Sequence, residues 1–488
     1  MKNKFIVALT ALCSSTMFAQ TRINFIEYDL PNGIHVILHE EHSTPIAAIS
    51  VLYHVGSKNE NPTKTGFAHF FEHLLFEGTQ NIGRGEYSEI VEKNGGTLNA
   101  NTSQDRTYYY EILPSNQVEL GIWLESERML HAKVDIKGIE TQRSVVKEEK
   151  RQRVDNQPYA SFITEMFVRA FPTHPYNWVP IGSMAHLDAA EEQDYVQFYQ
   201  DYYVPQNATI SIAGDIDVES TKRWINDYFG SIPSGKAINI YRDALSMSST
   251  QFKSKYGFSK KKINLENLNN TKNKKAKAII ASLSNTPTEI KRTTKDAEKL
   301  PSVIIDTVYD NIQLPGLFMA YKIPEQTHAD SYALEFMNEV LSGGTSSRIN
   351  KTLVEKKQLA NYAASFNYGL EDGGLNIFLA LANIGHTLTE VQNEFDEQIR
   401  LIKESLISEE EYQAVLNKFE NSIVGGNSTV VGIAESLADN YVYFGTAERT
   451  NQMLENYRKV TREDILRVAN TYLTQDARII LNYLPKKK

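Results

Sequence analysis

Residues 67–76, FAHFFEHLLF, alternate apolar and polar side chains at the spacing of an α-helix. At about 100° per residue, one stripe of this helix is apolar: Phe67, Phe70, Phe71, Leu74 and Leu75. The opposite stripe carries His69, Glu72, His73 and Phe76. Histidines that served only the core would share the stripe with the leucines. The pattern therefore predicts an amphipathic helix whose polar face has a use outside the core.

The rest of the first half mixes strands and helices. Period-two alternation and an Asn32-Gly33 turn predict strands near Asn24–Asp29, Ile34–His39, Ile46–Val55, Thr97–Thr102 and Thr107–Leu113. Helical spacing predicts helices over Tyr87–Lys93, Val118–Leu130 and Ile139–Arg151. Because strands and helices do not strictly alternate, we predict an α+β fold with mainly antiparallel sheets.

The chain repeats one design. Residues 194–214 and 464–484 each show an Asp, a Tyr eight positions later, a polar turn and a β-branched run. Residues 66–79, which carry the polar helix face, align with residues 331–344. There Leu334, Met337 and Asn338 stand in place of the two histidines and the glutamate. The pattern predicts two homologous halves. Because the second copy keeps the helix without His69, Glu72 and His73, we expect this trio to serve chemistry rather than the fold.

The composition is that of a globular protein, with 41% apolar and 23% charged residues, and 488 residues predict two to four domains. Lys2 and Lys4 precede an apolar run, so residues 1–20 are interpreted as a secretory signal peptide. The protein is then exported, and periplasmic if its source is a Gram-negative bacterium. Cys13 is the only cysteine, so the mature chain offers no disulfide and no thiol nucleophile. No later apolar run is long enough to predict a transmembrane anchor.

Charge is spread unevenly along the chain. Residues 236–300 hold fifteen Lys/Arg against five Asp/Glu, a balance of +10. Because the net charge of the whole chain is −9, the rest of the chain carries −19. We expect a solvated basic linker or insertion over 235–300. It would separate a first half over 21–234, which carries the polar trio, from a second half over 301–488, which lacks those candidate ligands. A basic arm for an acidic partner is the alternative. Nucleic acid is not expected as a partner, because the bulk of the chain is acidic and exported.

The polar helix face has the spacing of a metal site. Two histidines at i and i+4 can bind one zinc ion, and a carboxylate between them can act on a water in the open position. A chance H-x-x-E-H in a chain of this composition has a probability of about 2%. Catalytic zinc usually takes three protein ligands. His69 and His73 are therefore candidate ligands, Glu72 is the candidate catalytic base, and a third ligand must come from elsewhere.

The motif H-x-x-E-H marks the inverzincins, and the chain resembles the pitrilysin/insulinase family, nearest to the two-domain branch that includes mitochondrial processing peptidase. The likeness covers nearly all of the mature chain except the basic stretch. It implies two halves that form a clam-like chamber and a zinc metalloendopeptidase that cleaves peptides or unfolded chains. In QRSVVKEEKRQR it places the third ligand at Glu149, with Glu148 the nearest rival. Gln142 stands where the family usually has a supporting Glu.

The resemblance also implies a place for the substrate. In NGGTLNANTSQDRTYYY, Asn99 and Ala100 match the edge strand on which the family lays its peptide, and extended peptides add to such edges through backbone hydrogen bonds. A plain turn and strand would explain the same pattern. His174, in FPTHPYNWVPIG, is interpreted as structural because one lone His seldom carries chemistry.

One expected part is missing. Active members supply an Arg and a Tyr seven residues apart from the second half, whereas LVEKKQLANYA has Val354 and Asn361 there, with Tyr362 one residue out of register. Arg348 is a weaker substitute. Some bacterial relatives divide the work between two chains, which suggests a heterodimer whose partner supplies the Arg/Tyr pair. The alternatives are a non-catalytic assembly or chaperone-like subunit of the same fold, and a zinc hydrolase acting on something other than peptides.

Overall fold

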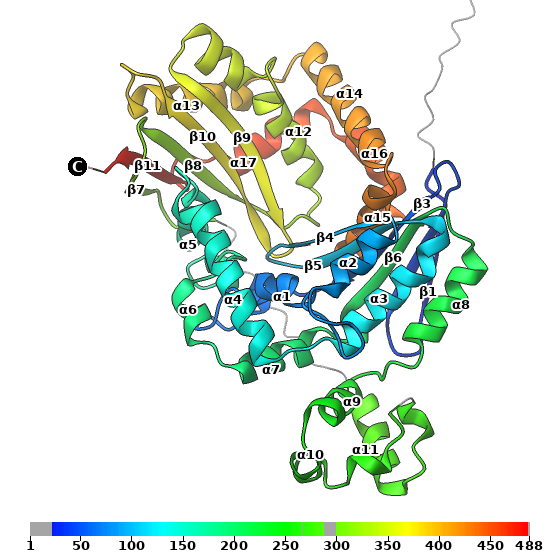
Figure 1. Cartoon of the computed structure of the whole chain (residues 1–488). Coiled ribbons are helices and arrows are strands. Elements are labelled where there is room, and N and C mark those ends of the chain that lie inside the picture. The colour runs from blue at the N-terminus through cyan, green and yellow to red at the C-terminus, as the bar shows by residue number, and fades with distance from the viewer. Residues whose placement is uncertain (1–21, 266, 287–298, 487–488) are drawn as a thin grey trace, which may run out of the picture.

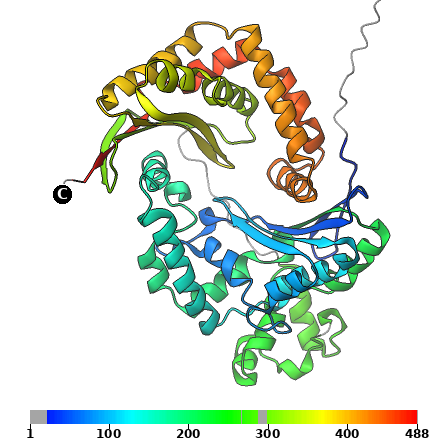
Figure 2. The ribbon, with the colours of Figure 1, turned by 45° about the horizontal axis from the view of Figure 1, so that its top comes forward.

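The computed structural model describes residues 22–265, 267–286 and 299–486, and the predicted signal peptide lies outside them. Figures 1 and 2 show two halves, each a β-sheet covered by helices, with a smaller helical lobe attached to the first half. Within the described residues, no helix has the length and apolar character needed to cross a bilayer.

The first sheet has the order β1-β2-β6-β3-β5-β4. Its strands are β1 (Ile26–Asp29), β2 (His35–Glu40), β3 (Ile46–Tyr53), β4 (Thr97–Thr102), β5 (Thr107–Pro114) and β6 (Ala208–Gly214). Only the β2–β6 pairing is parallel. The strands that alternation predicted are all present, and β4 forms one edge of the sheet.

The second sheet has the order β7-β11-β8-β10-β9. Its strands are β7 (Ile304–Asp310), β8 (Gly316–Ile323), β9 (Ala360–Leu370), β10 (Gly373–Ala382) and β11 (Ile479–Pro485). Only β7 and β11 run parallel. The order repeats that of β2, β6, β3, β5 and β4, so the two halves predicted from the internal repeat share one topology.

The helices repeat in the same order. The first half has α1 (Phe67–Leu74), α2 (Glu86–Lys93), α3 (Val118–His131), α4 (Ile136–Lys150), α5 (Phe162–Ala170), α6 (Met184–Ala189), α7 (Glu192–Tyr202) and α8 (Val218–Phe229). The second has α12 (Ser331–Ser342), α13 (Leu388–Glu404), α14 (Glu409–Gly426), α15 (Val430–Phe444), α16 (Arg449–Lys459) and α17 (Arg462–Tyr472). By position in the chain, α1 corresponds to α12 and α3–α7 correspond to α13–α17.

Each half lends one helix to the sheet of the other. Alternate residues of β3 are buried on both faces: Ile49 and Val51 join the core beneath α1, while Ala48 packs with Leu437 of α15. In the second sheet, Phe318 of β8 packs with Phe167 of α5. Figure 2 shows α5 and α15 bridging the two halves at opposite sides. Because the central strands β3, β6 and β8 are buried on both faces only in this arrangement, the hydrophobic effect favours the docked halves.

The expectation of a solvated linker is wrong for the described part of residues 235–300. The chain forms α9 (Ala237–Ser246), α10 (Ser249–Tyr256) and α11 (Lys274–Ser284) there. These helices share a small core that includes Phe252, Phe258 and Ile280. The apolar residues are few, but they are spaced so that three short helices bury them together. We call the described residues 235–286 the basic lobe.

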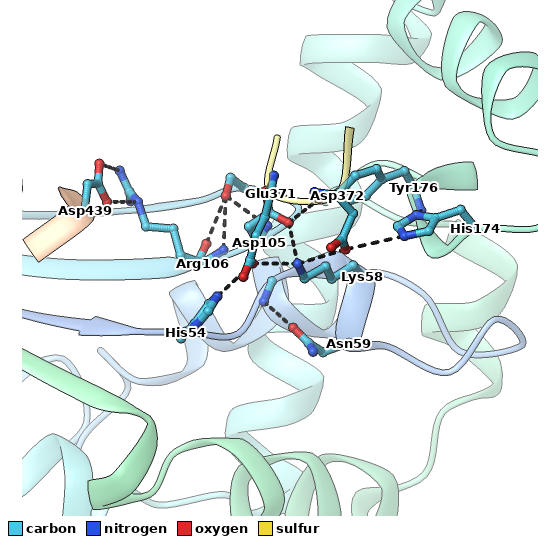
Figure 3. Close-up of polar contacts among 12 residues, drawn as sticks. His54, Lys58, Asn59, Asp105, Arg106, His174, Tyr176, Glu371, Asp372 and Asp439 are labelled. Carbon is cyan, nitrogen blue, oxygen red and sulfur yellow. Dashed lines mark hydrogen bonds and ion pairs between the residues drawn. The ribbon is translucent and has the colours of Figure 1, made fainter. Parts of the chain in front are cut away.

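A buried lysine joins the halves (Figure 3). Lys58, in the short helix Ser57–Asn59, places its Nζ 3.0 Å from Asp105 Oδ1, 2.6 Å from Glu371 Oε2 and 3.1 Å from Asp372 Oδ2. His174 lies beside it, with Nε2 3.4 Å from Asp372 Oδ2. Burial lowers the pKa of Lys58, but the surrounding carboxylates outweigh burial and raise it. One cation therefore neutralises carboxylates from both halves.

The turn between β9 and β10 is held by backbone bonds as well. The N–H of Glu371 donates to Asp105 Oδ2 at 2.9 Å, and the N–H of Asp372 donates to Tyr176 Oη at 3.0 Å. Tyr176 Oη donates in turn to Asp105 Oδ1 at 2.6 Å. Burial raises the pKa of Glu371, but its contact with His54 at 2.8 Å and nearby positive charge lower it to about 2. The tip of the second half is therefore fixed to the first by a charged network.

We expect Lys58→Met to weaken this contact strongly. The substitution leaves Asp105, Glu371 and Asp372 close together without their cation, and breaking a buried ion pair in this way costs about 3–5 kcal/mol. The measurement is the urea concentration at the unfolding midpoint. Lys222→Met is the control and should change little, because this partly exposed lysine pairs with Glu219 of its own helix. Equal midpoints for the two variants would contradict this account.

Candidate metal centre

Helix α1 carries the polar motif, and a carboxylate from the preceding loop holds its start. Glu60 accepts hydrogen bonds from the N–H of Gly66 and of Ala68, both at 2.8 Å. Gly66 has φ +99°, with the Ile181 carbonyl within 3.2 Å of where a Cβ would stand, so only glycine fits there without strain. Burial raises the pKa of Glu60 to about 8, although the two N–H donors lower it. Phe70, fully buried, anchors the apolar stripe.

The structure brings the two histidines and Glu149 together. His69 Nε2 lies 3.5 Å and His73 Nε2 lies 3.1 Å from Glu149 Oε2. The three donor atoms all lie within 4.8 Å of one another, the only such group of three or more His, Cys, Asp or Glu side chains that the described residues contain. Helix α4 carries Glu149 and packs against α1, so two helices far apart in the sequence build one cluster.

Glu149, and not Glu148, faces the histidines. The Glu149 side chain is 14% exposed, whereas Glu148 is 53% exposed and pairs with Arg151 at 3.2 Å. Hydrogen bonds from His69 and His73 hold the pKa of Glu149 well below its usual range. Of the two acidic residues that the sequence left as rivals, Glu149 is therefore the one that lies against the histidines.

These residues fit a zinc ion. Two tetrahedral ligands of zinc lie about 3.3 Å apart when the bonds are about 2.0–2.1 Å, close to the separations of Glu149 Oε2 from the two imidazoles. Two ring nitrogens and a carboxylate oxygen are all possible acceptors, and their convergence calls for a cation or protons between them. His69 Nδ1 is buried and makes no hydrogen bond within the described chain. Donor chemistry and spacing thus both suit the metal.

Two further predicted residues lie close by in the structure. Glu72 is half-buried on α1, between the two histidines in sequence. Gln142 Nε2 donates to Glu77 Oε1 at 2.5 Å, and Arg84 Nη1 lies 2.6 Å from Glu77 Oε2. The structure gives Gln142 no hydrogen bond to any of the three converging side chains. Its bond instead ties α4 to the turn that follows α1.

Asn99 and Ala100 lie on β4, at the edge of the first sheet next to α1. Strand β4 pairs only with β5 among the strands of the described chain. The N–H of Ala100 donates to the Asn99 side chain at 2.9 Å. The outer edge of β4, beside the three converging residues, is therefore open to pairing with a further strand.

Sequence reasoning missed two contributors to the site. Glu60 lies in a loop, and no local pattern links it to the helix that it caps. Arg153 Nη1 lies 2.8 Å from Glu149 Oε1, and its i+4 spacing from Glu149 was a signal that the sequence did contain. Glu60 holds the start of α1, and Arg153, whose side chain is 76% exposed, contacts Glu149 from the solvent side.

Comparisons with known proteins agree with this geometry. Residues 35–175 match the family model described as insulinase (peptidase family M16), and residues 190–419 match the peptidase M16 inactive domain. A zinc protease PqqE of Helicobacter pylori is 30% identical over 459 residues, covering 93% of this chain and 91% of that protein. A probable mitochondrial-processing peptidase subunit beta of Schizosaccharomyces pombe is 24% identical, covering 90% and 87%.

Solved structures show the same fold. A protease from Helicobacter pylori superimposes with a TM-score of 0.80 at 25% identity, covering 95% of this chain and 100% of that one. The periplasmic protease PqqL of Escherichia coli gives a TM-score of 0.68 at 16% identity, covering 96% of this chain and 48% of that one. The same family is indicated by two family models, by a relative aligned along nearly the whole length and by the fold of the solved structures. The chain therefore belongs to the insulinase family, peptidase family M16.

Proposed function

We propose that the protein is a zinc-dependent endopeptidase that cleaves peptides or unfolded chains held between its two halves. The observation that carries the proposal is the convergence of His69 Nε2, His73 Nε2 and Glu149 Oε2 at the end of a helix that also carries Glu72. Relatives named as zinc proteases support it. The proposal includes export, which rests on the signal-peptide pattern of residues 1–20, and a fold neighbour is described as periplasmic.

The residues divide the chemistry between them. His69, His73 and Glu149 would hold the ion, which when bound supplies a Lewis acid and an acidified water. A carboxylate oxygen of Glu72 takes a proton from the attacking water and returns it to the leaving amine. The edge strand β4, through backbone groups near Asn99 and Ala100, would align the peptide as an added strand. Such backbone pairing gives broad sequence preference.

The second half lacks donors at the places where related enzymes supply them. Val354 packs partly buried against the core of the second half. Arg348 forms a two-pronged contact with Glu411, at 2.8 and 2.9 Å, so its guanidinium is already engaged within the second half. Asn361 is exposed and Tyr362 is 53% exposed. We therefore include in the proposal a homologous partner chain that supplies the Arg/Tyr pair.

The rival function is a non-catalytic assembly or chaperone-like subunit of the same fold. The second-half family model is described as an inactive domain, which suits a subunit without catalysis. The complete donor set of the first half argues against this rival, because a subunit without chemistry has no need for a converging His/His/Glu cluster. Zinc bound to the purified protein would separate the two.

We expect Glu72→Gln to keep zinc and the fold but to abolish cleavage. The amide cannot accept the proton, and losing general acid–base catalysis costs on the order of 10²–10⁴-fold. The measurement is kcat/KM on a peptide library, with zinc content determined on the same sample. Glu89→Gln, at an exposed glutamate paired with Lys93, is the control and should leave the rate unchanged. Near-normal turnover of Glu72→Gln would remove Glu72 from the mechanism.

Glu149→Ala should lose zinc, whereas Glu148→Ala should keep it. Removing one of three ligands weakens the site, while Glu148 points to solvent beside Arg151. Metal analysis after dialysis measures the zinc content of both variants, and the adjacent glutamate serves as the matched control. The reverse result, with zinc lost only in the Glu148 variant, would overturn the assignment of the third ligand.

A partner chain that carries the Arg/Tyr pair should raise the activity of this chain. We expect the isolated chain to bind zinc but to turn over slowly, because Val354 and Asn361 cannot stabilise a developing oxyanion as an arginine and a tyrosine do. The assay compares the purified chain alone with an equimolar mixture containing a homologue encoded nearby. Full activity of the isolated chain, unchanged by the homologue, would refute the heterodimer and leave the zinc site untouched.

A further inference from the structure

The basic lobe presents charge of a single sign. Its described residues include eleven Lys or Arg and one acidic residue, Asp243, which is buried. Exposed lysines occur on each of its segments: Lys253 on α10, Lys261 and Lys262 in the following turn, and Lys274 and Lys277 on α11. The net charge of the whole chain is nevertheless −9. The protein is therefore strongly polarised, with an acidic body and a basic lobe.

The helices that carry these lysines are packed on one another and on the first half. Arg242 of α9 donates to the carbonyls of Met129 and Tyr203, both at 2.6 Å, and the Tyr241 hydroxyl lies 2.7 Å from His131 Nε2. Helices α10 and α11 pack on α9, and α9 packs on α3. Lys275 Nζ donates to the Gly257 carbonyl at 3.1 Å, which brings the end of α10 next to the start of α11. The lysine runs of α10 and α11 are thus adjacent on a folded support.

The composition of the lobe surface shows which partners it does not fit. None of its described residues is among the exposed large hydrophobic side chains of the protein. Its aromatic residues serve its own core, as Phe252 and Phe258 show. Protein interfaces are enriched in aromatic and Arg anchors and depleted in Lys, and nucleic-acid sites use Arg and aromatic faces for stacking. A surface of hydrated lysine point charges suits a diffuse anionic layer better.

From these observations we infer that the basic lobe is a docking surface for the anionic headgroups of a lipid bilayer. Each Lys close to such a surface contributes about 1 kcal/mol, and the attraction falls off within a Debye length, about 8 Å at physiological salt. The lobe projects from the body (Figure 1), so the acidic halves lie farther from the headgroups than the lysines do. The full-length protein would rest on the membrane without inserting, with α10 and α11 toward the lipid.

The test compares binding to vesicles of a neutral phosphatidylcholine with binding to vesicles that also contain about 30% phosphatidylglycerol, at low and at raised salt. We expect the full protein to co-sediment only with the anionic vesicles and to be released as salt rises. The lobe variant combines Lys253→Glu, Lys261→Glu, Lys274→Glu and Lys277→Glu, and should bind at least on the order of 10³-fold more weakly. None of these four side chains makes an ion pair within the described residues.

A second variant controls for net charge. It combines Lys93→Glu, Lys351→Glu, Lys356→Glu and Lys459→Glu, which lie on the body and change the charge by the same amount. Circular dichroism and zinc content should match the parent for both variants. Equal losses in the two variants would overturn the inference, because net charge rather than the lobe would then govern binding. So would equal binding to both kinds of vesicle, or binding to RNA or an acidic polypeptide without binding to anionic vesicles.

Discussion

The docking of the two halves is the constraint on which the rest of the structure depends. Each sheet buries its second face under a helix from the other half, and Lys58 neutralises carboxylates from both sides. Helix α4, which carries Glu149, leads through the short helical segment Arg151–Asp155 into α5, the helix that packs on the second sheet. The third member of the His/His/Glu cluster is therefore positioned by a segment whose far end is anchored in the opposite half. Geometry at the cluster and contact between the halves are coupled through the covalent chain.

Local periodicity predicted most of the elements around the site. The stripe of Phe70 and Phe71 against His69 and His73 identified α1, because helical burial repeats every three to four residues. Glu149 followed from a resemblance, and the structure then separated it from Glu148 by exposure. The Lys58 network could not be predicted in this way, since Lys58 and Glu371 lie far apart in sequence and no local pattern reports a contact between them.

The basic lobe shows why the composition of residues 235–300 led to the wrong prediction of a solvated linker. A segment rich in Lys, Asn and Ser with few apolar residues is typical of solvated chain, yet three short helices gather those apolar residues into one small core. The lobe also borrows stability from the body, because the buried Arg242 donates to backbone carbonyls of the first half. A hydropathy profile of the sequence cannot predict hydrogen bonds between a side chain and a distant backbone carbonyl. Segments docked on a larger domain need less core of their own than independent domains of the same length.

The exchange of α5 and α15 bears on the ancestry of the chain. The two halves share one order of strands and helices, and α5 and α15 occupy the same place in that order. A single ancestral half with such a helix would cover its sheet only by giving the helix to a second copy and receiving one in return, which describes a twofold-symmetric homodimer. Gene duplication and fusion of such a dimer would produce the present architecture. After such a fusion only one copy would need the histidines, and the equivalent helix of the other copy carries Leu334 and Met337, both buried in its core.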